Sequence, residues 1–143
     1  MKKYLATLFY FVCCSSFSLT LESVNVFGEE VSACNLSLNA ADASISSAMR
    51  FNRVGLSDDS KVKAYHQIGA MEVGSTCIAS LKFEIFFNSY VTLPPENTKR
   101  IFTSNVLCSK AHLMSGPKHD FGTRASNVLK QLVDLCINEI AKM

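Results

Sequence analysis

The clearest pattern of apolar and polar positions lies near the end of the chain, over residues 125–140. Apolar side chains recur there every three or four residues, with polar side chains on the opposite side, which is the spacing of an amphipathic α-helix. The apolar face consists of Ala125, Val128, Leu129, Leu132, Val133, Cys136, Ile137 and Ile140. We therefore predict a helix that packs this face against a core.

Two earlier segments have a similar spacing. Residues 29–50 carry apolar side chains at Val31, Cys34, Leu38, Ala41, Ile45 and Ala48, and this predicts a second helix. A third is expected to begin at the capping residues Ser57, Asp58 and Asp59 and to end near Gly74. Its apolar positions include Val62, Tyr65 and Ile68.

The middle of the chain is ambiguous. Residues 77–93 fit both a helix, through Ile78, Leu81 and Ile85, and a strand, through an alternation of apolar residues that includes Phe83 and Phe87. The length of this segment favours a helix, whereas its aromatic and β-branched content favours a strand. Another segment is expected to run from Pro95 to about residue 113, and residues 115–120 are expected to form a loop.

These segments together predict an all-α fold, a small disulfide-linked bundle of four to five helices. The fold class would be α+β instead if residues 77–93 form a strand. The chain of 143 residues is long enough for one globular domain.

The first 18 residues are typical of a secretory signal peptide. Lys2 and Lys3 precede an apolar run that ends at Cys14, and small residues at Ser16 and Ser18 suit cleavage after Ser18. Cleavage after residue 15 or 20 is an alternative. An uncleaved membrane anchor would need about 20 apolar residues, more than this run provides. We therefore expect a signal peptide at residues 1–18 and a single secreted, extracellular helical domain at residues 19–143, without a membrane span in the mature chain.

Removal of residues 1–18 changes both the charge and the cysteine count. It removes two of the 14 basic residues and none of the 12 acidic ones, so the net charge falls from +2 to zero. A neutral chain gives no reason to expect a nucleic acid or an anionic membrane as partner. Four of the six cysteines remain: Cys34, Cys77, Cys108 and Cys136.

Four widely spaced cysteines in an exported chain predict two disulfides, with three possible connectivities. Cys34 and Cys136 lie in the apolar faces of two predicted helices, so we expect each to crosslink one helix to another. The spacing contains no pair suited to zinc, and no metal site is expected. Asn35 begins the sequence Asn-Leu-Ser, a glycosylation acceptor in exported chains, and is expected to face solvent.

Candidate catalytic residues do not form a complete motif. The spacing of Gly69 and Gly74 is that of a phosphate-binding loop, but Ser75 stands where that motif needs Lys. The histidines His66, His112 and His119 lack the neighbours of known nucleophile or zinc motifs. We therefore expect no enzyme activity and no cofactor, and we nominate no catalytic residue.

Two functions remain as predictions, and the oligomeric state stays open. The first is a secreted, non-enzymatic protein that binds another extracellular protein, as effectors, venom or salivary components and signalling factors do. The alternative is a carrier of a small apolar ligand such as a lipid or an odorant. Its pocket would lie between helices and would be lined by Phe83, Phe86, Phe87, Tyr90 and Phe102.

Overall fold

The structure is a computed structural model, and it describes residues 20–23, 27–28, 34–57, 60–92, 94 and 100–143. The predicted signal peptide therefore lies outside the described residues. In chain order the elements are β1 (Thr20–Ser23), β2 (Phe27–Gly28), α1 (Leu38–Phe51), β3 (Gly55–Leu56), β4 (Val62–Val73), β5 (Thr76–Thr92), β6 (Arg100–Pro117) and α2 (Lys118–Ile140).

Three long antiparallel strands form the centre of the sheet. β4 pairs with β5 along its whole length, and β5 pairs with β6 from Thr76 to Thr92. The turn between β4 and β5 contains Gly74 at a φ of 61°, a left-handed conformation that glycine adopts without steric cost. The short strands β1 and β2 run parallel to β4, and β3 pairs with β1, which gives the order β3-β1-β4-β5-β6.

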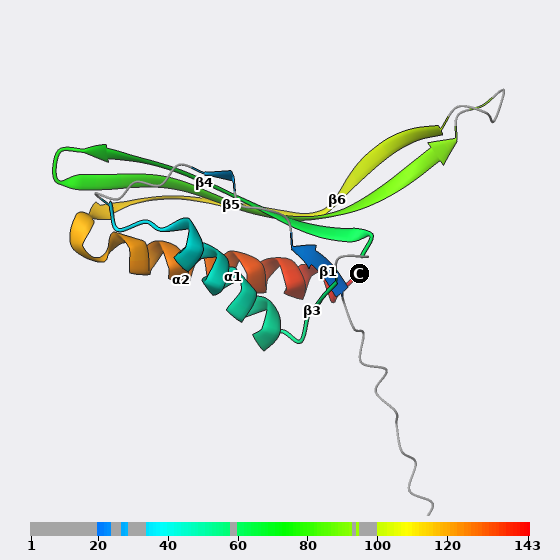
Figure 1. The fold of residues 1–143 in the computed structure, drawn as a ribbon, viewed down its shortest axis with the longest axis horizontal. Coiled ribbons are helices and arrows are strands. Elements are labelled where there is room, and N and C mark those ends of the chain that lie inside the picture. Colours follow the sequence, from blue (N-terminus) through cyan, green and yellow to red (C-terminus); the bar gives the residue numbers. More distant parts are fainter. Residues whose placement is uncertain (1–19, 24–26, 29–33, 58–59, 93, 95–99) are drawn as a thin grey trace, which may run out of the picture.

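Both described helices lie on the same side of this sheet (Figure 1), where α2 packs against β5 and β6 and α1 packs against α2. Alternate residues of β4 and β5 are buried toward the helices, as expected for a sheet with one covered face. The largest fully buried side chains are Phe83, Phe121, Ile68, Leu81, Ile85, Leu129 and Val133. The opposite face of the sheet carries no helix in the described part of the chain. We call it the open face.

The predicted all-α bundle is wrong, because residues 62–73, 76–92 and 100–117 form three strands rather than helices. Val62, Tyr65 and Ile68 lie at helical spacing, but the residues that face the core are Ala64, His66 and Ile68. A strand requires a period of two, and the small Ala64 and polar His66 obscured it. Within the ambiguous segment 77–93, residues 77–92 belong to a strand, which the sequence left open as the alternative, and residue 93 lies outside the described residues.

The helices also differ in extent from the expected ones. The helix predicted at residues 125–140 is confirmed as part of α2, which begins at Lys118 and so includes part of the predicted loop. The helix predicted over residues 29–50 begins only at Leu38, because Ser37 caps it with its side-chain oxygen. None of the described helices combines the length and the apolar character needed to cross a bilayer.

The structure pairs the four cysteines at disulfide distance, Cys34 with Cys77 and Cys108 with Cys136. The expected links between helices are wrong, since each bond has one partner on a strand. Cys77 lies at the start of β5 and is bonded to the segment before α1, while Cys108 of β6 is bonded to α2. One disulfide therefore fastens α2 to the sheet, and the other fastens the segment just before α1 to it.

Candidate protein-interaction site

The β5–β6 hairpin extends well beyond the rest of the molecule. β4 begins at Val62, which pairs with Phe87, whereas the pairing of β5 with β6 continues to Thr92 and Arg100. We call residues 86–92 and 100–106 the arm. Figure 1 shows it projecting past the ends of both helices.

A β-bulge marks the base of the arm. Ile85 pairs with Cys108, but the next residue, Phe86, pairs with Val106, so Leu107 has no counterpart on β5. Such an extra residue bends the strand and increases its twist. In Figure 1 the arm accordingly turns away from the helical layer.

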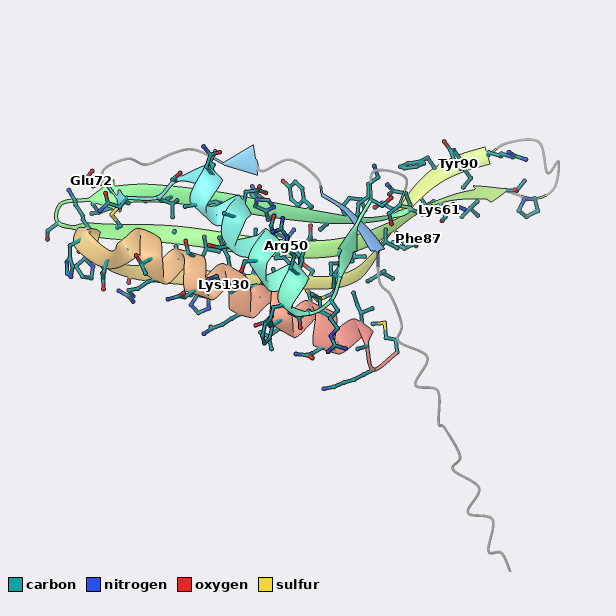
Figure 2. The ribbon with its side chains drawn as sticks, turned by 60° about the horizontal axis from the view of Figure 1, so that its bottom comes forward. Arg50, Lys61, Glu72, Phe87, Tyr90 and Lys130 are labelled. Atoms are coloured by element: carbon teal, nitrogen blue, oxygen red, sulfur yellow. A yellow bond between two sulfur atoms is a disulfide. The ribbon has the colours of Figure 1, made fainter. Side chains whose placement is uncertain are left out.

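Apolar side chains are exposed on both faces of the arm. Tyr90 and Phe102 pair across the strands with their rings edge to face, 5.4 Å apart between centroids, yet they remain 69% and 55% exposed. Val106 lies on the same face by strand alternation, and Val91 and Ile101 are exposed on the other. Figure 2 shows Tyr90 far from the helices, and Phe87 near the base of the arm.

Polar contacts hold the two strands of the arm in register. The hydroxyls of Ser89 and Thr103 are 3.1 Å apart, and the side-chain amide of Asn105 donates to the Ser89 hydroxyl. The Thr103 hydroxyl also reaches the Ser89 carbonyl at 3.3 Å. The arm is thus an ordered ribbon whose exposed apolar residues have fixed positions.

Apart from Arg100 at its end, the arm also lacks the charges that normally protect sheet edges. Residues 85–92 and 101–109 contain no Asp, Glu, Lys or Arg. In the described part of the chain β6 pairs only with β5, so its other edge is unpaired. Native proteins usually place Lys, Pro or a covering element on such an edge. An uncharged, apolar edge is typical of a surface that another chain covers.

The aromatic residues predicted to line a ligand pocket do not share one cavity. Phe83 is fully buried against the helical layer, while Phe86 and Phe87 are half-buried at the base of the arm. Only Tyr90 and Phe102 are brought together, and they lie at the exposed part of the arm. The prediction of a carrier pocket at these residues therefore has no support from their positions.

Hollows on the surface are lined by other residues. One of about 290 Å³ lies between the ends of α1 and α2, against Val54, Ile137 and Ile140. Another, of about 390 Å³, is a shallow depression on the open face between Gly69, Met71 and Leu113, and a third of about 160 Å³ lies beside Asn35. None of these three is lined by the five aromatic residues.

The three histidines lie on three different elements of the fold. His66 of β4 is buried beneath the helices, its Nε2 has no hydrogen-bond partner, and desolvation lowers its pKa against the opposing effect of Asp42. His112 and His119 are exposed on β6 and in the first turn of α2. No group of His, Cys, Asp and Glu suited to a metal occurs among the described residues.

Asn35 is exposed, as expected, although it lies in a turn rather than on a helix. Its φ is 51°, and it stands between the buried Cys34 and the helix cap Ser37. Its glycosylation stays a prediction.

Comparisons with known proteins show the fold and no more. No protein-family model matches the chain, and neither does any curated protein. The chain is similar to a solved structure of the hypothetical protein CT253 from Chlamydia trachomatis, with 9% sequence identity and a TM-score of 0.57. That match covers 88% of this chain and 99% of the other.

A second solved structure is more distant. It is a dodecamer of a PelC variant from Paraburkholderia phytofirmans, with 10% identity and a TM-score of 0.43 over 83% of this chain and 85% of that one. This likeness adds nothing to the description of the fold.

Sequence reasoning singled out four arm residues as pocket-lining and missed the arm itself. The available signal was the pair of uncharged, β-prone runs on either side of Pro94 and Pro95. Two such runs joined by a turn segment are typical of a hairpin.

Proposed function

We propose that this chain is an exported, non-enzymatic protein that acts by binding another protein through the arm. The observation that carries the proposal is the exposure of Tyr90, Phe102 and Val106 on an ordered ribbon whose described residues carry charge only at Arg100. A two-stranded ribbon without a third strand or a covering helix is marginally stable in water. A partner that covers the arm would remove its apolar surface from water, and this favours binding.

Export is the second part of the proposal. The two disulfides are compatible with an extracellular location, because they form and persist in oxidising compartments. The signal-peptide pattern of residues 1–18 supports the same location.

The alternative function, a carrier of a small apolar ligand, has weaker support. The hollow beside Val54, Ile137 and Ile140 is apolar, but at about 290 Å³ it is at the lower end of the range of small-molecule sites. It is also open to solvent, whereas such sites usually bury most of their ligand.

A photo-crosslinking experiment tests the proposal. A benzoyl-phenylalanine at position 102 replaces one aromatic side chain of the arm by a reactive one of similar shape. The matched control is the same replacement at Phe51, which is 86% exposed at the end of α1 and remote from the arm. Both chains are exported by their source cells, irradiated, and analysed by mass spectrometry.

We expect a discrete protein adduct at position 102 and none at position 51. Equal adducts at the two positions, or no protein adduct at position 102, would contradict the proposal. An adduct with a small apolar molecule at position 102 would instead favour the carrier.

A further inference from the structure

The free edge of β6 has a symmetric order of side chains. Residues 101–107 read Ile-Phe-Thr-Ser-Asn-Val-Leu, that is, two apolar residues, three polar residues and two apolar residues. The order is the same from either end, with Ser104 at the centre. Symmetry of this kind is a requirement of an interface in which two identical surfaces meet about a two-fold axis.

An antiparallel pairing of two β6 edges about Ser104 would place each apolar residue opposite an apolar residue and each polar residue opposite a polar one. Phe102 would lie opposite Val106 of the second copy. Ile101 would lie opposite Leu107 of the second copy, the bulge residue at the end of the paired stretch, which already packs in part against its own core. Thr103 would lie opposite Asn105 of the second copy, and Ser104 opposite itself. Cross-strand pairs of apolar side chains, and of hydroxyl and amide side chains, stabilise antiparallel strands.

If the two-fold axis is moved by one residue along β6, apolar residues no longer lie opposite apolar residues. An axis at Thr103 would place Phe102 opposite Ser104, and an axis at Asn105 would place Val106 opposite Ser104. Positions between residues would pair side chains from opposite faces of the sheet, because side chains alternate along a strand. The sequence of the edge therefore selects one register.

The rest of the molecule leaves room for the pairing. The helical layer lies on the Cys108 side of the arm, where α2 is bonded to β6. In one copy the helices lie beyond one end of the arm (Figure 1), so antiparallel pairing would send the helices of the two copies in opposite directions from Ser104. Since residues 101–109 carry no charge, the pairing brings no like charges together within that stretch.

We propose that the partner bound by the arm is a second copy of this chain, joined through antiparallel pairing of residues 101–107 about Ser104. This inference rests on the proposed role of the arm in protein binding. The two sheets would then form one continuous sheet, and Phe102 and Val106 of each copy would be covered by the other.

Charge substitutions at the symmetry centre test the pairing. In Ser104→Lys two ammonium groups would face each other across the axis, and in Ser104→Glu two carboxylates would. Like charges directly opposite are destabilising, whereas opposite charges are favourable. We therefore expect each variant alone to be monomeric and an equimolar mixture of the two to recover the dimer, as measured by light scattering or sedimentation.

Ser80 provides the matched control. It is an exposed serine on β5 that lies outside the arm and away from the β6 edge. Ser80→Lys and Ser80→Glu should both remain dimeric, like the parent chain.

A monomeric parent chain at micromolar concentration would overturn the inference, and so would a mixture of the two Ser104 variants that stays monomeric. The crosslinker at position 102 distinguishes a failure of self-pairing from a failure of the proposed protein-binding function. A monomeric chain that forms an adduct with a different protein keeps the arm as a binding site and rejects self-pairing. A chain without any protein adduct rejects both.

Discussion

Gly122 of α2 lies directly against the backbone carbonyl of Asn35. A Cβ built at Gly122 would lie 1.9 Å from the Asn35 carbonyl oxygen, far inside van der Waals contact. The approach lets the first turns of α2 pass close to the segment that holds Cys34. A side chain at this position would have to displace backbone rather than a flexible side chain.

We expect Gly122→Ala to lower the free energy of unfolding. Overpacking costs about 1–3 kcal/mol, and the gain of about 1 kcal/mol that alanine brings to a helix interior offsets part of it, which leaves a net loss of up to about 2 kcal/mol. The control is Gly69→Ala, since nothing lies within 4 Å of a Cβ at Gly69. Chemical denaturation measures both, and equal stabilities for the two variants would contradict the expectation.

Asn52 at the end of α1 joins the two helices. Its side-chain amide donates to the Ala48 carbonyl at 2.8 Å and to the Asp134 carboxylate of α2 at 2.6 Å. Hydrogen bonds to charged groups contribute about 1.5–3 kcal/mol. We expect Asn52→Ala to reduce stability by about that amount.

A double-mutant cycle checks that the loss comes from this pair. Asp134→Ala in the Asn52→Ala background should cost less than in the parent chain, because the contact is already absent. Additive losses would show that Asn52 acts only as the cap of α1.

The buried His66 predicts a loss of stability in acid. Desolvation lowers its pKa in the folded chain below the ordinary value of 6.5, so the unfolded chain takes up the proton first. Stability is therefore complete above pH 6.5 and falls as the pH drops from there toward the lowered pKa of the folded state. The fall amounts to about 1.4 kcal/mol for each pKa unit by which the two states differ.

Urea denaturation of His66→Gln across this pH range isolates the effect. The variant should lose less stability than the parent chain on acidification, because glutamine does not titrate. His112→Gln is the control, since His112 is exposed, and it should follow the parent. Parallel pH profiles for all three chains would rule out His66 as the source.

Loss of the Cys108–Cys136 disulfide should affect stability more than recognition. The bond closes a separation of 28 residues and fastens α2 to β6. We expect the Cys108→Ala, Cys136→Ala double variant to lose about 2–4 kcal/mol of unfolding free energy. The adduct at position 102 should persist at a temperature where the variant is still folded.

The parts of the fold that could be predicted from sequence are those with local causes. The apolar stripe around Leu129 and Val133 specified α2, and the four cysteines specified two bonds without their connectivity. The sequence predicts a helix in place of β4 because Val62, Tyr65 and Ile68 lie three residues apart by coincidence. β4 is a strand because it pairs with β5. This interaction is non-local, and the spacing of apolar residues along the chain does not indicate it.

The candidate site depended on non-local facts to a greater degree. Tyr90 and Phe102 were recognised as aromatic, but their exposure follows from where β4 begins and where the helices end. The sequence does not indicate that β4 begins at Val62 and leaves the arm uncovered. The pairing register of the sheet shows this. The sequence shows that residues 101–109 carry no charge. This indicates an interaction surface only because β6 lies at the edge of the sheet, which the structure shows.

The uncharged edge of β6 has a cost during biogenesis. A short segment of high β propensity, low charge and few glycines is a typical starting point for cross-β aggregation when it meets unpaired strands. Neither disulfide lies within the arm, so oxidation of the chain does not shield it. Chains at high local concentration are therefore at risk of fibril formation for as long as this stretch of β6 stays uncovered.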